Sequence, residues 1–264
     1  MFQDFAFQHG LIIDSLVFDQ WVRVKTVDKP NKKNGAYIFD GKFGAIINFA
    51  THENHISYRE DDTYVPTVQD KVKREMANQE RIKRQEEAKR KASYIMRNAV
   101  LMQHPYLLRK GFEDKGYVWN GLLILPMRID SRLVGCQMIQ EDGTKRFLSG
   151  QITKGASLII DNKGPDFICE GFATGLSVRR ALKSIKARYK IHVCFSASNM
   201  IEISKGLNQP RVIADNDEVG VRTAKKIASH YWIGEAGQDF NDYELLFGTE
   251  KAADSLKPFL EGWN

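Results

Sequence analysis

Short apolar runs alternate with longer amphipathic segments through the C-terminal half of the chain. Residues 166–169 and 211–214 each end in three consecutive apolar residues, as strands buried on both faces do. Each run is followed by a glycine and then by apolar positions at helical spacing. The pattern predicts further strands at 191–195 and 231–233, and helices at about 174–187, 199–206, 219–230 and 250–260. This alternation predicts a small parallel sheet flanked by helices.

Two earlier regions have the period-two alternation of strands that are exposed on one face. In the N-terminal region it predicts strands at 21–27, 36–39 and 45–49. Asp40-Gly41 lies between the last two and is a hairpin signal. In the second region, the pattern predicts strands at 122–127, 133–139 and 145–148.

Between these two regions, residues 67–99 contain no Pro or Gly and are rich in strong helix formers, so they predict one long helix. Its apolar residues are too sparse for a coiled-coil seam. Pairs such as Glu80 with Arg84 suit a solvated helix stabilised by local charge pairs. Two interpretations remain open, a basic arm that binds nucleic acid and a charged spacer.

These patterns divide the chain into four segments. We predict a small β-rich domain at 1–66, a charged helical linker at 67–104, a basic β-rich subdomain at 105–161, and a domain of alternating strands and helices at 162–264.

Composition adds a preference for an anionic partner. The 264 residues include 39 Lys and Arg against 33 Asp and Glu, a formal charge of +6. The three cysteines lie far apart without a CxxC pair, which argues against a cysteine zinc site and a disulfide framework. The N-terminus lacks a basic segment followed by an apolar one, and no run approaches the roughly 18 apolar residues of a spanning helix. We therefore expect a cytoplasmic protein without a membrane partner.

Carboxylates follow two of the predicted strands directly. Glu170 comes after 166–169, and Asp215 and Asp217 come after 211–214. Open α/β sheets bind ligands at the C-terminal ends of their strands, and clustered carboxylates repel one another unless a cation lies between them. Oxygen ligands favour Mg²⁺ or Mn²⁺, so the pattern predicts a metal site. The alternative is that the Asp residues cap a helix and that Glu170 is merely exposed at a strand end.

Three acidic motifs in this order resemble those of a Toprim domain: EGFATGLS from Glu170, DNDEVG from Asp215, and Asp239-Phe-Asn-Asp242. That domain is shared by bacterial DnaG-type primases, type IA and type II topoisomerases and some nucleases. The resemblance implies a Rossmann-like parallel sheet flanked by helices, within a chain of mixed α/β and α+β class. It also implies that Glu170 is a general acid/base or a metal ligand, and that Asp215, Asp217 and Asp239 bind Mg²⁺ or Mn²⁺.

The stretch upstream of these motifs resembles primases in particular. Gly143-Thr-Lys-Arg-Phe-Leu-Ser-Gly, followed by Thr153-Lys-Gly155, resembles the basic region that precedes the Toprim domain in primases. The whole chain is similar to phage- and plasmid-borne Toprim primases of the TraC type, which are related to the DnaG type. The resemblance implies that Lys145, Arg146 and Lys154 contact the template or the incoming triphosphate. Asn199 is a candidate contact to a nucleotide phosphate or a helix cap.

The implied activity is synthesis of short RNA primers on single-stranded DNA from nucleoside triphosphates. A 3′-hydroxyl attacks an α-phosphate and pyrophosphate leaves, while cations held by the carboxylates neutralise the phosphates. The sequence contains no GxxxxGK[ST] loop. We therefore expect a replicative helicase or replication initiator to act in trans.

Two departures from the family pattern bear on how the chain would work. The glutamate motif often carries an acidic residue four positions on, where this chain has Thr174. The cysteine zinc module that many primases use in start-site selection is also missing. The alternatives are another Toprim enzyme, nuclease or topoisomerase-like, and a non-catalytic replication accessory protein that binds single-stranded DNA. A topoisomerase would need a nucleophilic tyrosine on a separate domain, and a nuclease of the overcoming-lysogenisation type would need an ATPase.

Overall fold

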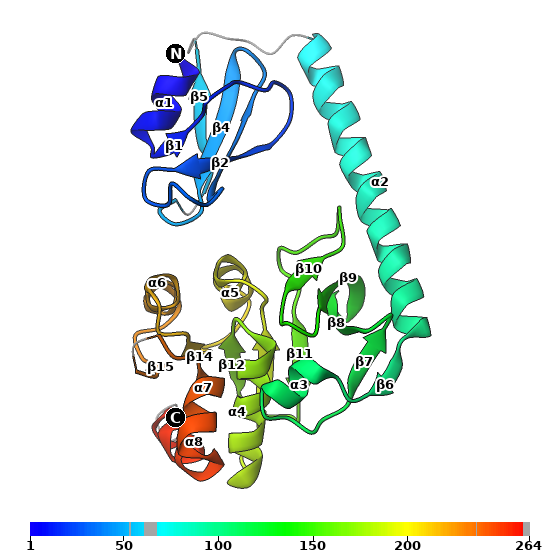
Figure 1. Ribbon diagram of the computed structural model, residues 1–264, viewed down its shortest axis with the longest axis vertical. Coiled ribbons are helices and arrows are strands. Elements are labelled where there is room, and N and C mark those ends of the chain that lie inside the picture. Colours follow the sequence, from blue (N-terminus) through cyan, green and yellow to red (C-terminus); the bar gives the residue numbers. More distant parts are fainter. Residues whose placement is uncertain (53, 61–67, 236, 261–264) are drawn as a thin grey trace. The chain divides into compact units, whose positions relative to one another are not determined.

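The computed structural model describes residues 1–52, 54–60, 68–235 and 237–260, and three five-stranded sheets organise them (Figure 1). They divide into two units, Met1–Arg74 and Glu75–Asn264. The predicted start of the charged segment at residue 67 lies outside the described residues. Within the described part of the chain, no helix combines the length and the apolar character that crossing a membrane requires.

The N-terminal unit contains one antiparallel sheet whose strands follow one another in chain order. They are β1 (Leu11–Ile12), β2 (Val22–Thr26), β3 (Gly35–Phe39), β4 (Phe43–Asn48) and β5 (Ile56–Arg59). Helix α1 (Phe2–Gln8) covers one face, where Phe2 and Ala6 are buried against Tyr37 and Ile46. The period-two pattern therefore predicted β2, β3 and β4, because one face of the sheet packs against α1, whereas β1 and β5 were not predicted.

The hairpin predicted at Asp40-Gly41 is confirmed. Strand β3 pairs antiparallel with β4, and the carboxylate of Asp40 accepts hydrogen bonds from the backbone N–H groups of Lys42 and Phe43, at 2.9 and 2.7 Å. Gly41 has a φ of 100°, a conformation in which a β-carbon would be strained.

The long predicted helix is present as α2 (Val68–Asn98), and the division between the two units falls within it. Its later turns are not fully solvated, which differs from the sequence expectation. Ala92 and Ile95 are completely buried and pack with Ile124 and Cys136 of the second sheet. A narrow apolar stripe at helical spacing is enough for this contact, although it is too sparse to be conspicuous among the charged residues.

The second sheet is antiparallel and has the order β10-β9-β8-β7-β6. Its strands are β6 (Val100–Met102), β7 (Gly116–Trp119), β8 (Leu122–Ile129), β9 (Arg132–Ile139) and β10 (Lys145–Phe147). Helix α3 (Pro105–Arg109) connects β6 to β7 and begins at His104, whose side chain accepts a hydrogen bond from the Tyr106 N–H. A tight turn between Ile129 and Arg132 joins β8 to β9.

The third sheet has the order β11-β13-β12-β14-β15. Strands β12 (Asp166–Cys169), β13 (Lys190–Val193), β14 (Arg211–Ala214) and β15 (Tyr231–Ile233) run parallel, as predicted. Strand β11 (Leu158–Asp161) pairs antiparallel with β13. Sequence analysis placed these four residues with the preceding β-rich segment, but their backbone hydrogen bonds belong to the third sheet.

Helices cover both faces of this third sheet. They are α4 (Phe172–Ser184), α5 (Ala197–Ser204), α6 (Glu218–Ile227), α7 (Phe240–Phe247) and α8 (Thr249–Leu256), followed by the 3₁₀ helix η1 (Lys257–Phe259). One core joins the sheet to α4, α7 and α8, and another joins it to α5 and α6. Cys169 and Cys194 are fully buried in these cores.

Candidate functional site

The ends of β12 and β14 form a topological switch point in the third sheet. The two strands are parallel neighbours, but the chain continues from β12 to β13 on one side and from β14 to β15 on the other. The connecting helices α4 and α6 pack on opposite faces, so a crevice is expected beyond these strand ends. Glu170 directly follows β12, and Asp215 directly follows β14. The fold therefore brings these two predicted residues to one place.

A cavity of about 330 Å³ lies at this switch point. Its lining includes the carboxylates of Glu170, Asp215 and Asp239, together with Lys145 of β10 and a pair of cations at the end of α3. The cavity is thus built by both sheets of the second unit. Acidic groups beside the parallel sheet share one space with basic groups of the antiparallel sheet, whose β9–β10 turn adds a fourth carboxylate, Asp142, to the lining.

The two cations at the end of α3, Arg109 and Lys110, were not predicted as site residues. Both line the cavity, and the Lys110 Nζ lies 3.5 Å from the Asp242 carboxylate. Their only sequence signal is two adjacent cations after a short helix that begins with Pro105. That signal is common on protein surfaces and does not indicate that α3 lies beside the acidic motifs.

Asp215 has the most perturbed carboxylate of the site. Its Oδ1 atom is buried and has no hydrogen-bond partner among the described residues. Burial, followed by repulsion from Glu170, Asp239 and Asp217, raises the pKa of this carboxyl to about 7, and Lys145 opposes the rise. A buried oxygen without a partner is costly, so this atom indicates a ligand.

Glu170 is perturbed in the same direction for similar reasons. Burial raises the pKa of its carboxyl, and the nearby charge of Asp217 adds to the rise. Lys145 and a hydrogen bond from the backbone of Ala197 favour the charged form. A carboxyl with a raised pKa can accept or release a proton closer to neutral pH than an exposed glutamate can.

Asp217 caps helix α6. Its Oδ1 accepts a hydrogen bond of 2.6 Å from the Gly220 N–H, and it is exposed. The capping role left open by the sequence is therefore present. It occupies one carboxylate oxygen, and the charge of Asp217 still raises the pKa of both Glu170 and Asp215.

Asp239 likewise caps helix α7. Its Oδ1 accepts a hydrogen bond of 2.8 Å from the Asp242 N–H, and the Asp242 side chain accepts one of 3.5 Å from the Asp239 N–H. This capping box fixes Asp239 at the wall of the cavity. Asp242 is exposed and pairs with Lys110.

The carboxylates fit a cation that takes only part of its ligands from protein. Across residues 1–52, 54–60, 68–235 and 237–260, no group of three or more His, Cys, Asp or Glu side chains is positioned to hold a metal ion. Mg²⁺ commonly binds one or two carboxylates and keeps waters or substrate phosphates as its other ligands. The unpartnered Oδ1 of Asp215 is the protein atom that such a cation would satisfy.

The three predicted basic residues lie in different surroundings. Lys145 lines the cavity and favours the ionised forms of Glu170 and Asp215. Arg146 is exposed on the same strand, and alternation points it to the opposite face from Lys145. Lys154 lies in the loop after β10 and forms an ion pair of 3.6 Å with Glu202.

Asn199 is buried in α5, and its amide is committed to the backbone. Its Oδ1 accepts a hydrogen bond of 2.7 Å from the Gly155 N–H, and its Nδ2 donates to the carbonyls of Ala156 and Cys194, at 2.7 and 2.8 Å. These bonds tie the loop that carries Lys154 to the third sheet. The side chain is therefore positioned to hold this loop rather than to contact a ligand.

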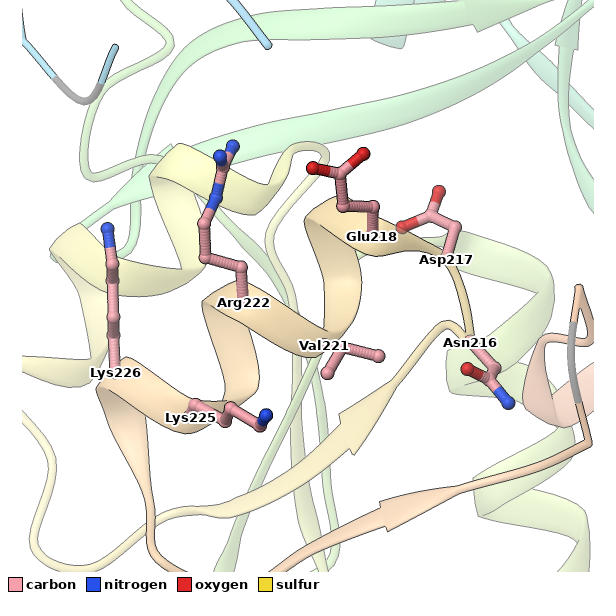
Figure 2. A pocket seen from close by; sticks show the side chains of 7 residues that line it. All are labelled: Asn216, Asp217, Glu218, Val221, Arg222, Lys225 and Lys226. Atoms are coloured by element: carbon pink, nitrogen blue, oxygen red, sulfur yellow. The ribbon is translucent and has the colours of Figure 1, made fainter. Parts of the chain in front are cut away.

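Helix α6 begins at an acidic end, beside Asp217, and bears cations along its later turns. A shallow depression of about 580 Å³ lies along this helix. Figure 2 shows Asp217 and Glu218 at the start of the helix and three cations further along, Arg222, Lys225 and Lys226. Arg222 lies five residues after Asp217, a rise of about 7.5 Å along a helix. Sequence reasoning did not select these cations, because basic residues in a last helical turn are common.

No family model matches the chain, and no curated protein matches it. Among solved structures, it is similar to the primase fragment of the bacteriophage T7 primase-helicase protein, with a TM-score of 0.41 and 12% sequence identity. That alignment covers 58% of this chain and 69% of the fragment. A similarity this weak does not establish a shared activity.

Proposed function

We propose that this protein is a DNA primase that synthesises short RNA primers on single-stranded DNA during phage or plasmid replication. It would act on nucleoside triphosphates in the presence of Mg²⁺ or Mn²⁺, and a helicase or initiator in trans would supply the open template. The proposal combines the Toprim-like order of the acidic motifs with one structural observation. That observation is the unpartnered, buried Oδ1 of Asp215 in a cavity shared with Glu170, Asp239 and Lys145.

In this proposal the carboxylates of Asp215, Asp217 and Asp239 hold the cations, which supply positive charge to the reacting phosphates. Capping leaves Asp217 and Asp239 each with a second carboxylate oxygen for this role. Glu170 accepts the proton of the attacking 3′-hydroxyl or completes the metal site. Its raised pKa suits the first role, because a general base works best when its pKa is near the working pH.

The cations of the cavity would position the substrate in this proposal. Lys145, Arg109 and Lys110 line the same space as the carboxylates and would bind the phosphates of the incoming nucleotide or of the template. Arg146 and Lys154 lie nearby in the chain but outside the lining, so they would touch the template beyond the cavity.

A template-dependent incorporation assay tests the proposed activity. Labelled ribonucleotides, Mg²⁺ or Mn²⁺ and mixed-sequence single strands should give short RNA products with the wild-type protein. Asp215→Asn should abolish them, and Asp254→Asn, an exposed carboxylate paired with Lys257, should not. Synthesis by Asp215→Asn at the wild-type rate would contradict the assignment.

Metal binding can be measured without any activity. Mn²⁺ should raise the thermal midpoint of the wild-type protein, because a ligand that binds only the folded state stabilises it. A concentration of 100 times the dissociation constant would add about 2.7 kcal/mol. The increase should be lost in Asp215→Asn and kept in Asp254→Asn. An equal increase in all three proteins would exclude a cation site at Asp215.

The same reaction mixtures separate the competing functions. Cleavage of a labelled strand without incorporation would indicate a nuclease that uses the same carboxylates. Strand binding with neither reaction, under conditions in which Mn²⁺ binds, would indicate a replication accessory protein.

A further inference from the structure

One face of the N-terminal sheet carries exposed side chains rather than a helix. Strand side chains alternate between faces, so the register that sends Val22, Tyr37 and Ile46 toward α1 sends their neighbours to the opposite side. On that opposite side, strands β2 and β5 present Arg23, Lys25, Ser57 and Arg59, all of which are exposed. Helix α1 covers the other face (Figure 1).

Two large aromatic rings are exposed on this open face. Trp21 precedes β2 and Phe49 follows β4, each at the alternation that places it opposite the core, and they are 49% and 44% exposed. Exposed apolar surface gathered on one face and bordered by polar residues is a feature of interaction sites. Each of the two rings contacts a neighbouring side chain. The Trp21 ring lies 4.9 Å from that of His55, and the Arg23 guanidinium lies 4.3 Å from the centre of the Phe49 ring.

Arg23 is itself fixed in place beneath this contact. Its Nε and Nη2 donate hydrogen bonds to the carbonyl of Lys33, at 3.1 and 2.7 Å. The guanidinium and the Phe49 ring therefore form a preorganised pair. A further planar group could stack on such a pair without first ordering two flexible side chains.

The charged side chains at the strand positions of the open face are all cations, Arg23, Lys25 and Arg59. The other strand positions on this face are Ser57 and the apolar residues Ile12, Ala36, Ile38, Phe43, Ala45 and Ile47, of which Ala36 and Ile47 are buried. None of these described strand positions carries Asp or Glu. The carboxylates of Asp28 and Asp40 lie in loops, where they accept hydrogen bonds from Asn48 and from the backbone after Asp40.

We propose that this open face binds single-stranded nucleic acid, with bases stacked on Trp21 and Phe49 and phosphates paired with Arg23, Lys25 and Arg59. Exposed aromatic rings among cations suit a single strand, because every unpaired base offers a π-face and every linkage offers a negative charge. A duplex hides its base faces. The chemistry uses no base edge, so binding should depend on the presence of bases and little on their identity.

This site is separate from the carboxylate cavity, and its existence does not require the proposed synthesis. It belongs to Met1–Arg74, whereas the cavity belongs to Glu75–Asn264. The chain would then hold a strand through a unit whose sequence contains no cysteine. Binding at this unit raises the local concentration of template for any reaction in the other unit.

Matched variants of the full-length protein distinguish stacking from simple apolar contact. Trp21→Tyr with Phe49→Tyr keeps two rings, and Trp21→Leu with Phe49→Leu keeps apolar area but removes stacking. Affinity for fluorescent 20-nucleotide oligo(dT) should stay within a few-fold in the first variant. In the second it should fall by a factor on the order of 10 to 10³, because one to two bases no longer stack. Phe7→Leu, which removes an exposed ring on α1, should have no effect.

An abasic strand of the same length provides the second measurement. The wild-type protein should bind it more weakly than oligo(dT), and the leucine variant should bind the two strands alike. Photo-cross-linking with 5-iodouracil strands, mapped by mass spectrometry, should mark Trp21 or Phe49. Circular dichroism must show that each variant keeps the wild-type fold.

Three outcomes would overturn this proposal. They are equal affinity of the leucine and tyrosine variants for oligo(dT), cross-links confined to residues after 74, and tighter binding of a matched duplex than of the single strand. Failure of the proposed synthesis is seen separately, because a protein without incorporation activity would still show base-dependent binding at Trp21 and Phe49. Asp215→Asn should bind oligo(dT) as the wild type does.

Discussion

Gly220 approaches the backbone of Asp215 so closely that a β-carbon at residue 220 would lie 2.2 Å from the Asp215 carbonyl oxygen. The N–H of the same glycine donates to the capping carboxylate of Asp217. One residue without a side chain thus sets the geometry of both aspartates, because the turn from β14 into α6 closes around it.

Gly220→Ala is therefore expected to lower the stability of the protein and to displace Asp215 and Asp217. The atom in the way belongs to the backbone and cannot rotate aside, so the chain must shift, at a cost of about 1–3 kcal/mol. Chemical denaturation measures the loss, and Mn²⁺ stabilisation should weaken along with it. Gly206→Ala is the control, because the nearest atom to a β-carbon there is 3.8 Å away. Equal stability of both variants would show that the turn relaxes without cost.

Asp215→Asn should change how stability depends on pH in the absence of divalent cations. The folded pKa of about 7 lies above the ordinary value of 3.8, so the folded protein holds a proton that the unfolded chain has already released. The contribution of this group to stability therefore falls as pH rises from about 4 to 7 and is flat above that range. Asp215→Asn should remove this fall. Denaturation midpoints at pH 5 and pH 8 check it, and a variant less stable than wild type at pH 8 would contradict it.

Glu170→Gln should separate binding from synthesis. Glutamine keeps the size of the side chain but has no negative charge and cannot accept the proton. Strand and Mn²⁺ binding should stay near the wild-type values, while the initiation rate falls by a factor on the order of 10² or more. Asp254→Asn, in an exposed pair with Lys257, is the control. Parallel loss of binding and synthesis would indicate a structural role for Glu170.

Lys145→Ala should shift the pH dependence of synthesis to higher pH. Lys145 opposes the rise in pKa of both Glu170 and Asp215. Removing Lys145 should therefore raise both pKa values, so that the two carboxyl groups ionise at higher pH. Arg146→Ala removes the neighbouring charge from outside the cavity lining and should leave the profile in place. Rates measured from pH 6 to 9 distinguish the two variants, and identical profiles would show that Lys145 acts only by binding phosphate.

Replacing Lys145, Arg146 and Lys154 together with Ala should weaken strand binding and reduce its dependence on salt. The slope of log affinity against log salt should flatten by up to about 0.7 for each phosphate that the variant no longer neutralises. The contribution of Lys154 is expected to be the smallest, because it already pairs with Glu202. An unchanged slope would assign the salt dependence to other cations, such as those of α2 or of the open face of the N-terminal sheet.

The sequence alone determined the elements and the local order of the site. Apolar runs at 166–169 and 211–214 predicted β12 and β14, because a strand buried on both faces needs continuous apolar residues. Glu170 and Asp215 directly follow these runs, so the sequence placed both at C-terminal ends of strands. Parallel pairing of the two strands then brings both residues to the same edge of the sheet. Period-two alternation likewise predicted β2, β3 and β4 of the N-terminal sheet, because alternate side chains of these strands pack against α1.

The tertiary structure decided which distant segments meet. The sequence does not bring Arg109 and Lys110 to the acidic cavity, or pair β11 with β13, because such neighbours depend on packing summed over the whole unit. The sequence also left open what the side chain of Asn199 contacts and whether the apolar residues of α2 are packed. Three backbone groups from two loops occupy the amide of Asn199, and the second sheet buries Ala92 and Ile95. A local pattern shows what a side chain can do, and only the partners that surround it in the fold decide what it does.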